Sequence, residues 1–317
     1  KRPKPWTNFL IIPRFARMSI NTKNDLNGFL IIDKPLNIGS TTVVSKLKWA
    51  LSPQKIGHAG TLDPLATGVL PIAFGHATKL IPFVMDGTKT YEFTVTWGIQ
   101  TDTDDAAGSP LKTSPNRPSK TDILATLSNF IGDIDQLPPA YSALKVSGKR
   151  AYDLARTGKI PDLKPRPIHI DALELLETTT DTASFRVTCS KGTYVRSLGR
   201  DIGERLGCFG YITSLRRLAC GPFRIEDALP LSTFSDKGSS VSLLPMDAAL
   251  GHLPILDLPM ELTLRLRQGQ RLPLRDIRPF LQTHLTDDMI LRLHTKDQFI
   301  GLVRFFQGTI HPYRVFP

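Results

Sequence analysis

Apolar and polar residues follow the two periods of secondary structure along most of the chain. Short apolar stretches, and alternations with a period of two, predict strands. These strands are expected at 28–35, 68–75, 90–100, 168–177 and 183–190. Apolar residues spaced three or four apart predict helices. These helices are expected at 41–51, 77–86, 119–132 and 193–207. Because strands and helices do not alternate strictly, the pattern predicts an α+β fold on a mixed sheet.

A boundary between two domains is expected near residue 250. The stretch PMDAALGHLPILDLP, residues 245–259, has the composition of a short connector punctuated by proline. After it, the runs LTLRLR, MILRLH and FIGLVRFF predict short strands separated by turns. We therefore expect a main domain over 25–250 and a small β domain over 252–317.

The composition excludes several classes of protein. The 317 residues are 41% hydrophobic, and no apolar run approaches the roughly 18 residues that a membrane-spanning helix needs. Cys189, Cys208 and Cys220 have the spacing of neither a disulfide framework nor a metal knuckle, which indicates reduced thiols in a cytoplasmic protein. His58 and His76 lack the spacing of a ligand pair. Since GxGxxG and P-loop motifs are also missing from the sequence, we expect no metal and no cofactor.

The net charge of +11 is concentrated in two stretches. Residues 1–24 carry six Lys and Arg and no acidic residue, and residues 140–224 carry fifteen basic against eight acidic residues. This distribution predicts a surface that faces a polyanion, with solvated lysines as the alternative that charge alone leaves open. We expect 1–24 to be a mobile tail without a function of its own. Met18 as the true start, or a transit peptide, are the other interpretations.

The densest cluster of glycine and proline is GHAGTLDPLATGVLPIAFGHATKL, residues 57–80. Its glycines and the proline after Asp63 predict a tight loop that presents Asp63 at its tip. A carboxylate displayed from a rigid loop suits a nucleophile or a general base. Because Asp before Pro is also an ordinary turn residue, the loop alone leaves the role of Asp63 open.

This stretch resembles the catalytic motif of the TruB family of tRNA pseudouridine synthases, in which the Asp of the GTLDP run is the essential carboxylate. Further segments resemble the family in order and at compatible spacing. These segments are 30–41, 89–108, 138–156, 189–207 and 211–223. The resemblance covers roughly residues 25 to 250 and implies a pseudouridine synthase catalytic domain. The resemblance of 252–317 to the family's RNA-binding PUA domain is much weaker, and the tail before Asn27 has no counterpart.

The resemblance also implies roles for individual residues. Asp63 corresponds to the catalytic aspartate, Arg196 to the arginine that pairs with it, and Tyr91 to the tyrosine that stacks on the target uracil. The other residues implied to bind substrate are His58 for everting the nucleotide, Tyr194 as a nearby aromatic at the same strand end as Arg196, Leu215 lining the pocket, and Lys34 and Lys79 in supporting motifs.

The chemistry of the implied reaction suits these residue types. Turning uridine into pseudouridine breaks an N–C glycosidic bond and forms a C–C bond without redox change, so the reaction needs no cofactor. Asp63 must be ionised, and an adjacent Arg196 favours the charged form. Tyr91 can stack on a uracil that has left the helix. Attack on C1′, attack on uracil C6 and promotion of elimination all remain open.

A basic segment at 139–167 is expected to close over an RNA hairpin, because its part at 145–166 holds seven basic and two acidic residues. The residues of this clamp are Lys145, Lys149, Arg150, Arg156 and Lys159.

The resemblance implies a cytoplasmic monomer that modifies position 55 in the T-arm loop of tRNAs without an obligate protein partner. A non-catalytic tRNA-binding or tRNA-folding module is one alternative, which the presence of Asp63, Tyr91 and Arg196 disfavours. A pseudouridylase directed at rRNA or snRNA is the other alternative, which the short C-terminal domain disfavours.

Overall fold

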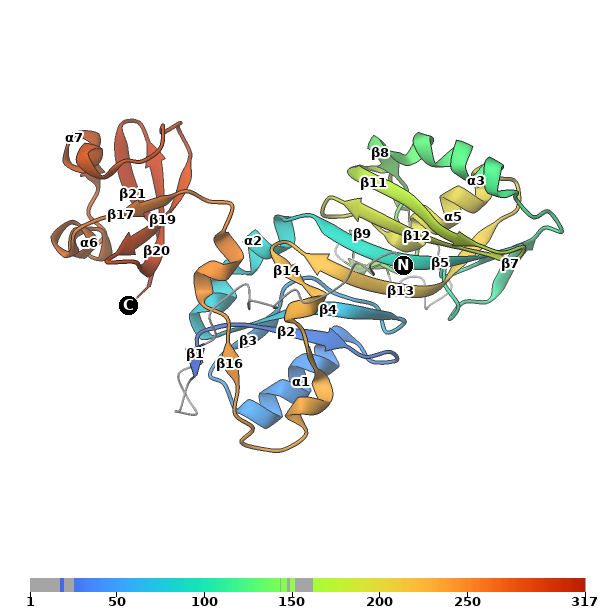
Figure 1. Cartoon of the computed structure of the whole chain (residues 1–317), viewed down its shortest axis with the longest axis horizontal. Coiled ribbons are helices and arrows are strands. Elements are labelled where there is room, and N and C mark those ends of the chain that lie inside the picture. The colour runs from blue at the N-terminus through green and yellow to red at the C-terminus, as the bar shows by residue number, and fades with distance from the viewer. Residues whose placement is uncertain (1–17, 20–25, 143, 147–148, 152–161, 317) are drawn as a thin grey trace, which may run out of the picture.

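The computed structural model describes residues 18–19, 26–142, 144–146, 149–151 and 162–316. Figure 1 shows a long twisted sheet running through the main domain, with α1 against one part of it and α3 and α5 over the other part. The small C-terminal domain lies at the far end of the molecule (Figure 1). Of the predicted tail, only Met18–Ser19 lies within the described residues, as strand β1 paired with β16 (Ser242–Leu243).

The main domain is built on a ten-stranded sheet in the order β15-β2-β4-β13-β5-β12-β11-β8, with β3 beside β4 and β14 beside β13. Its strands are β2 (Gly28–Lys34), β3 (Ile56–His58), β4 (Ala66–Phe74), β5 (Lys89–Trp97), β8 (Gly132–Gln136), β11 (Arg166–Thr178), β12 (Thr182–Cys189), β13 (Gly210–Cys220), β14 (Phe223–Arg224) and β15 (Leu229–Pro230). The β4–β13 and β2–β15 pairs are parallel and the other pairs are antiparallel. The prediction of an α+β fold on a mixed sheet is confirmed.

The predicted helices of this domain are present. They are α1 (Ser40–Leu51), the 3₁₀ helix η1 (Gly75–Leu80) followed by α2 (Ile81–Asp86), α3 (Lys120–Leu127) and α5 (Val195–Arg205). Ser119 caps α3, since its side chain accepts a hydrogen bond from the Asp122 amide while the Asp122 carboxylate accepts one from the Ser119 amide. Gly98, at φ 97°, ends β5 and separates it from β6, so the strand predicted at 90–100 is divided in two.

Short elements complete the main domain. They are β6 (Ile99–Thr101), β7 (Pro110–Thr113), η2 (Ser128–Phe130), β9 (Lys145–Val146), β10 (Lys149–Arg150), η3 (Ile225–Asp227), η4 (Leu231–Phe234) and η5 (Met246–Leu250). Its largest core packs α1 and α5 against one face of the sheet and includes Leu47, Phe93, Phe185 and Leu198. No helix within the described ranges is both long enough and apolar enough to cross a membrane.

The C-terminal domain has a five-stranded sheet in the order β17-β19-β20-β21-β18. Its elements are β17 (Ile255–Asp257), α6 (Met260–Arg267), β18 (Leu272–Pro273), α7 (Leu274–Ile277), η6 (Arg278–Phe280), β19 (Ile290–Thr295), β20 (Gln298–Phe306) and β21 (Thr309–Val315). The predicted strands over MILRLH and FIGLVRFF are confirmed as β19 and β20.

The strand predicted over LTLRLR is wrong, because this run forms helix α6. Thr263 and Leu266, three residues apart, are its buried positions, which suits a helix packed on one face. Glu261 in the first turn, and Arg265 and Arg267 in the last turn, also complement the helix dipole. The packing of one helix face and the charged residues at the two ends of α6 therefore outweigh the period-two alternation of leucine, which by itself predicts a strand.

The two domains share an apolar contact. Leu302 and Phe316 of the C-terminal domain belong to the same buried cluster as Phe29, Val69 and Ala249 of the main domain. The C-terminal domain also has a separate core of its own. Its attachment to the main domain is therefore a packed interface as well as a connector.

Candidate active site

Asp63 lies in the loop between β3 and β4, and this loop is tied down on both sides of the aspartate. The Ser40 hydroxyl accepts a hydrogen bond from the Leu62 amide at 2.8 Å and donates one to the Leu62 carbonyl at 3.0 Å. The Lys34 amine donates to the Pro64 carbonyl at 3.4 Å. Because its immediate neighbours are held, the Asp63 carboxylate is presented from a fixed backbone, with 39% of its side chain exposed.

Arg196, in the first turn of α5, reaches the Asp63 carboxylate. Its Nε is 2.9 Å from Oδ2 of Asp63, and its side chain is only 7% exposed. Its two terminal nitrogens donate to the carbonyls of Thr103 and Tyr141 at 2.9 and 3.0 Å. The guanidinium is therefore held by the backbone, and its direction fixes that of the carboxylate.

Asp105 is a second carboxylate beside the same guanidinium, and sequence reasoning did not single it out. Its Oδ2 is 3.8 Å from Nε of Arg196. The Thr103 hydroxyl and the Ala107 amide donate to its Oδ1 at 2.6 and 3.0 Å. The available signal was the pair of adjacent acidic residues in TDTDDAAG, residues 101–108, because acidic side chains are almost never buried unless they are paired.

Asp104 and Arg200 hold the middle of α5 against the same turn. Nη1 of Arg200 is 2.9 Å from Oδ2 of Asp104, and its Nη2 donates to the Leu137 carbonyl at 2.8 Å. Burial raises the pKa of Asp104 to about 6, against the opposing charges of Arg200 and Arg196. This ion pair fixes the helix that carries Arg196.

Tyr91 and Leu215 come from the neighbouring strands β5 and β13. The Tyr91 ring is partly exposed, and burial around its hydroxyl raises the pKa of Tyr91 to about 12. Leu215 is buried and lies in register with Phe93 of β5 and Ala66 at the start of β4. Tyr91 therefore lies near the start of β5, and Leu215, in the middle of β13, lies beside the start of β4, directly after the loop that carries Asp63.

Tyr194 stands at the N-cap of α5, two residues before Arg196, so it begins a helix and does not lie at a strand end. Its amide donates to the Gln136 side chain at 2.8 Å, and its carbonyl accepts from the same side chain at 3.1 Å. Burial raises the pKa of Tyr194, and both Arg196 and Asp63 are close enough to act on it by their charge. The structure therefore brings Tyr194 to the site.

His58 and Lys34 are two further bases near the loop. Burial, and then the charge of Arg217, lower the pKa of His58, so its imidazole is neutral at pH 7. Lys34 is fully buried and donates to the carbonyls of Pro35 and Ile38 at 2.9 and 2.7 Å. Burial lowers the pKa of Lys34 to about 8, while the charge of Asp63 acts in the opposite direction.

Lys79 is not brought to this site. It lies in η1, after the end of β4, whereas Asp63 precedes the start of that nine-residue strand. Its ammonium lies 5.8 Å from the centroid of the Phe316 ring, at the contact with the C-terminal domain. A contact between Lys79 and RNA remains a prediction for a region away from the uracil.

The predicted clamp residues fall largely outside the described part of the chain. Arg156 and Lys159 lie outside the described residues, as do the side chains of Lys145, Lys149 and Arg150. The backbone of the latter three belongs to the short pair β9 and β10. Their role in RNA binding stays a prediction.

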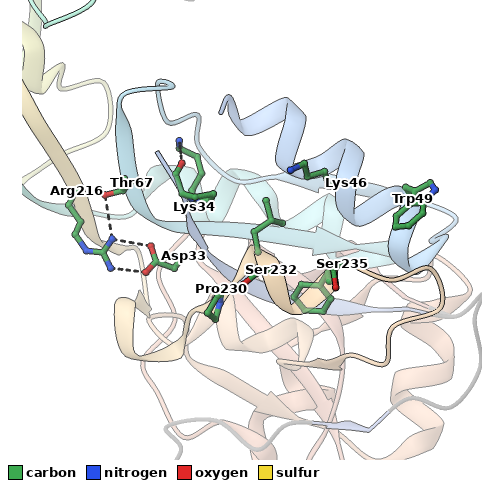
Figure 2. A pocket seen from close by; sticks show the side chains of 12 residues that line it. Asp33, Lys34, Lys46, Trp49, Thr67, Arg216, Pro230, Ser232 and Ser235 are labelled. Atoms are coloured by element: carbon green, nitrogen blue, oxygen red, sulfur yellow. Dashed lines mark hydrogen bonds and ion pairs between the residues drawn. The ribbon is translucent and has the colours of Figure 1, made fainter. Parts of the chain in front are cut away.

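A groove of about 740 Å³ is lined by Lys34, which contacts the loop that carries Asp63 (Figure 2). An ion pair in which both terminal nitrogens of Arg216 contact the Asp33 carboxylate, at 3.0 and 2.8 Å, closes one end. Lys46 and the exposed Trp49 of α1 lie at the other end (Figure 2). Arg216 therefore belongs to this groove, whereas the adjacent Arg217 is buried.

The residues of the site suit acid–base or nucleophilic chemistry. A partly exposed carboxylate, a fixed guanidinium and a partly exposed tyrosine come from neighbouring elements. Among the residues that the structure describes, no three His, Cys, Asp or Glu side chains gather as ligands of a metal ion.

Two family models match consecutive parts of the chain. The TruB family pseudouridylate synthase (N terminal domain) model matches residues 48–195, and the tRNA pseudouridylate synthase B C-terminal domain model matches residues 196–251. The chain belongs to the TruB family. Asp63 and Tyr91 lie in the first TruB segment and Arg196 in the second, so both segments contribute to the site.

Curated relatives cover most of the chain. The tRNA pseudouridine synthase B of Paracoccus denitrificans is 50% identical over 233 residues, which are 73% of this chain and 78% of the relative. The protein of the same name from Rhodospirillum rubrum is 45% identical over 296 residues, 92% of this chain and 96% of the relative.

A solved structure has a similar fold. A chain in the structure of an H/ACA RNP bound to a substrate RNA containing 2′-deoxyuridine matches with a TM-score of 0.69 at 22% identity. The match covers 92% of this chain and 85% of that chain.

Proposed function

We propose that this TruB protein converts uridine to pseudouridine at position 55, in the T-arm loop of tRNAs. The observation that carries the proposal is the pair formed by Asp63 and Arg196, 2.9 Å apart at the tip of a rigid loop, beside the partly exposed ring of Tyr91. The names of the curated relatives support tRNA as the substrate class.

Each residue has a defined part in the proposed reaction. The target uridine leaves its stack, and its uracil lies against the face of Tyr91, a contact worth about 1–3 kcal/mol. Arg196, 2.9 Å from the Asp63 carboxylate, keeps that carboxylate directed at the nucleotide. The N1–C1′ bond breaks, C5 of the rotated uracil bonds to C1′, N1 gains a proton and C5 loses one, so that product and substrate are isomers.

Regions away from the uracil supply affinity for RNA in this proposal. The basic segment 139–167 contacts phosphates of the hairpin, and the C-terminal domain acts as a PUA-like RNA-binding module that contacts more of the tRNA. The enzyme works in the cytoplasm as a monomer without an obligate protein partner.

Release of tritium from C5-labelled uridine tests the proposal. A T-arm hairpin labelled in this way is compared with a hairpin that has cytidine at the target and labelled uridines elsewhere. We expect release from the first hairpin only, because the reaction removes the C5 hydrogen of one nucleotide. Absence of release from the first hairpin, with the RNA bound, would reject the proposed function.

A further inference from the structure

Arg217 is a buried guanidinium that joins both sides of the catalytic loop. Its side chain comes from β13, and the residue is 1% exposed. Nε donates to the Val69 carbonyl at 2.7 Å, and Nη2 donates to the Gly60 carbonyl at 3.1 Å. Since Gly60 precedes Asp63 and Val69 follows it, a single side chain fixes the distance between the two ends of the loop.

Two glycines, Gly60 of the loop and Gly68 of β4, lie directly against Arg217. Gly60 and Gly68 have φ values of +100° and +97°, which favour glycine. A Cβ at Gly68 would lie 2.2 Å from the Arg217 carbonyl oxygen, and one at Gly60 would lie 3.4 Å from its Nη1. The Gly-rich sequence around Asp63 therefore matches the need to pack directly on Arg217.

Arg217 has a third contact, with Tyr91. The two residues are directly opposite each other in the β5–β13 pair. The guanidinium acts on the Tyr91 hydroxyl both as a hydrogen-bond donor and through its charge, and the charge lowers the pKa of Tyr91 against the larger effect of burial. The hydroxyl end of the ring is thereby anchored, while the ring remains partly exposed.

This buried cation has no carboxylate partner within the described ranges of the chain. Arg196 and Arg216, by contrast, pair with Asp63 and Asp33. Burial of an unpaired charge costs free energy, so a residue of this kind indicates a role other than stability. The ionisable groups within reach of its charge are Lys34, His58, Lys89 and Tyr91.

We propose that Arg217 is a positioning residue, which holds the Asp63 loop and the Tyr91 ring in one arrangement so that the everted uracil enters a preformed site. The inference rests on the proposed function, because it takes Asp63 and Tyr91 as the groups that meet the substrate. Arg217 itself touches carbonyls and a hydroxyl of the protein. Its effect on the reaction is therefore exerted through the groups that it holds.

The test measures single-turnover tritium release and hairpin affinity separately in Arg217→Gln and Arg217→Lys. We expect the rate of Arg217→Gln to fall about 100-fold, the size of effect that a misplacement of about 1 Å can produce. Affinity should change less than about threefold, because phosphate contacts dominate it. Arg205→Gln, at an exposed arginine in the last turn of α5, is the control and should keep the wild-type rate.

A double-mutant cycle with Tyr91→Phe separates positioning from a loss of structure. If Arg217 acts partly through the Tyr91 hydroxyl, Arg217→Gln lowers the single-turnover rate by a smaller factor in the Tyr91→Phe background than in the wild type. Arg217→Gln should also raise the imidazole pKa of His58, measured by NMR titration with His58→Gln for assignment, because the charge that lowers it is gone.

Two results would overturn the proposal. One is a wild-type rate in a folded Arg217→Gln protein. The other is a double mutant whose loss of rate is the product of the two single-mutant losses, together with an equal loss of affinity. If Arg217→Gln does not fold, the rate of Arg217→Lys tests the proposal instead, because one ammonium cannot reach all three partners. A wild-type rate in Arg217→Lys would exclude positioning. Asp63→Asn is measured alongside. Tritium release in that variant would reject the catalytic role on which the proposal rests, whatever the result at Arg217.

Discussion

The Asp63 carboxylate lies 2.9 Å from Nε of Arg196, and the same guanidinium is held by two backbone carbonyls. The pair is therefore arranged before any substrate arrives, with the arginine as its fixed member. Asp105, 3.8 Å from the same nitrogen, shares the charge of this guanidinium. Because the cation serves two carboxylates, its direction decides how strongly it stabilises Asp63.

Replacing Arg196 by Gln should impair the chemical step far more than RNA binding. The variant removes the fixed charge beside Asp63 and leaves Asp63 and Asp105 without the cation that they share. We expect the single-turnover rate to fall by about 100-fold or more, the range for loss of one fixed electrostatic contact. Hairpin affinity, measured by filter binding, should remain near the wild-type value. A loss of affinity as large as the loss of rate would assign Arg196 to binding instead.

The rate should fall as the pH rises through about 8, the pKa of Lys34. Below this pH the buried ammonium donates to Ile38 and Pro64 and places a positive charge near Asp63. Deprotonation removes the charge and weakens the anchor of the loop. Lys34→Arg, which stays charged throughout this range, should lack the alkaline fall. A rate profile from pH 7 to 9.5 that is the same in both proteins would contradict this origin.

Neutralising Lys149, Arg150 and Lys159 together should weaken hairpin binding and flatten its salt dependence. Each lost phosphate contact should lower the slope of log affinity against log salt by about 0.7–0.9. The rate at saturating RNA should change little. The matched control replaces the exposed Lys120 and Lys237 on other elements, which should keep the wild-type slope. An unchanged slope in the triple variant would reject the clamp.

Deleting the chain from residue 252 onward should leave a folded main domain with lower thermal stability. Leu302 and Phe316 are removed from a cluster that they share with the main domain, which uncovers apolar surface. Affinity for whole tRNA should fall more than affinity for a T-arm hairpin, because the C-terminal domain is proposed to contact RNA outside the hairpin. Equal losses on both RNAs would show that it does not.

Much of the fold follows from local patterns in the sequence. The strands at 28–35 and 183–190 and the helix at 41–51 are formed as predicted, because their apolar faces match the core that they cover. Helix α6 could not be read in this way, since its leucines alternate as in a strand while its packing and end charges favour a helix.

The site was partly accessible from the sequence. The loop around Asp63 follows from its glycines and proline. The pairing of Asp63 with Arg196 joins segments 133 residues apart, and only the family resemblance pointed to it. Asp105 and Arg217 were missed because their roles depend on burial and on neighbours from other strands. The one local signal for Arg217 is its position beside Arg216, since adjacent residues in a strand face opposite sides of the sheet.

Asp63→Asn tests the central claim most directly. The substitution keeps size, polarity and turn preference and removes the charge that the reaction needs. Tritium release from a T-arm hairpin is measured together with hairpin binding and circular dichroism, and Asp86→Asn, at an exposed aspartate, serves as the control. We predict that release falls by about three orders of magnitude or more while binding and folding are retained. Wild-type release from a folded Asp63→Asn protein would contradict the account and leave Asp63 as an ordinary turn residue.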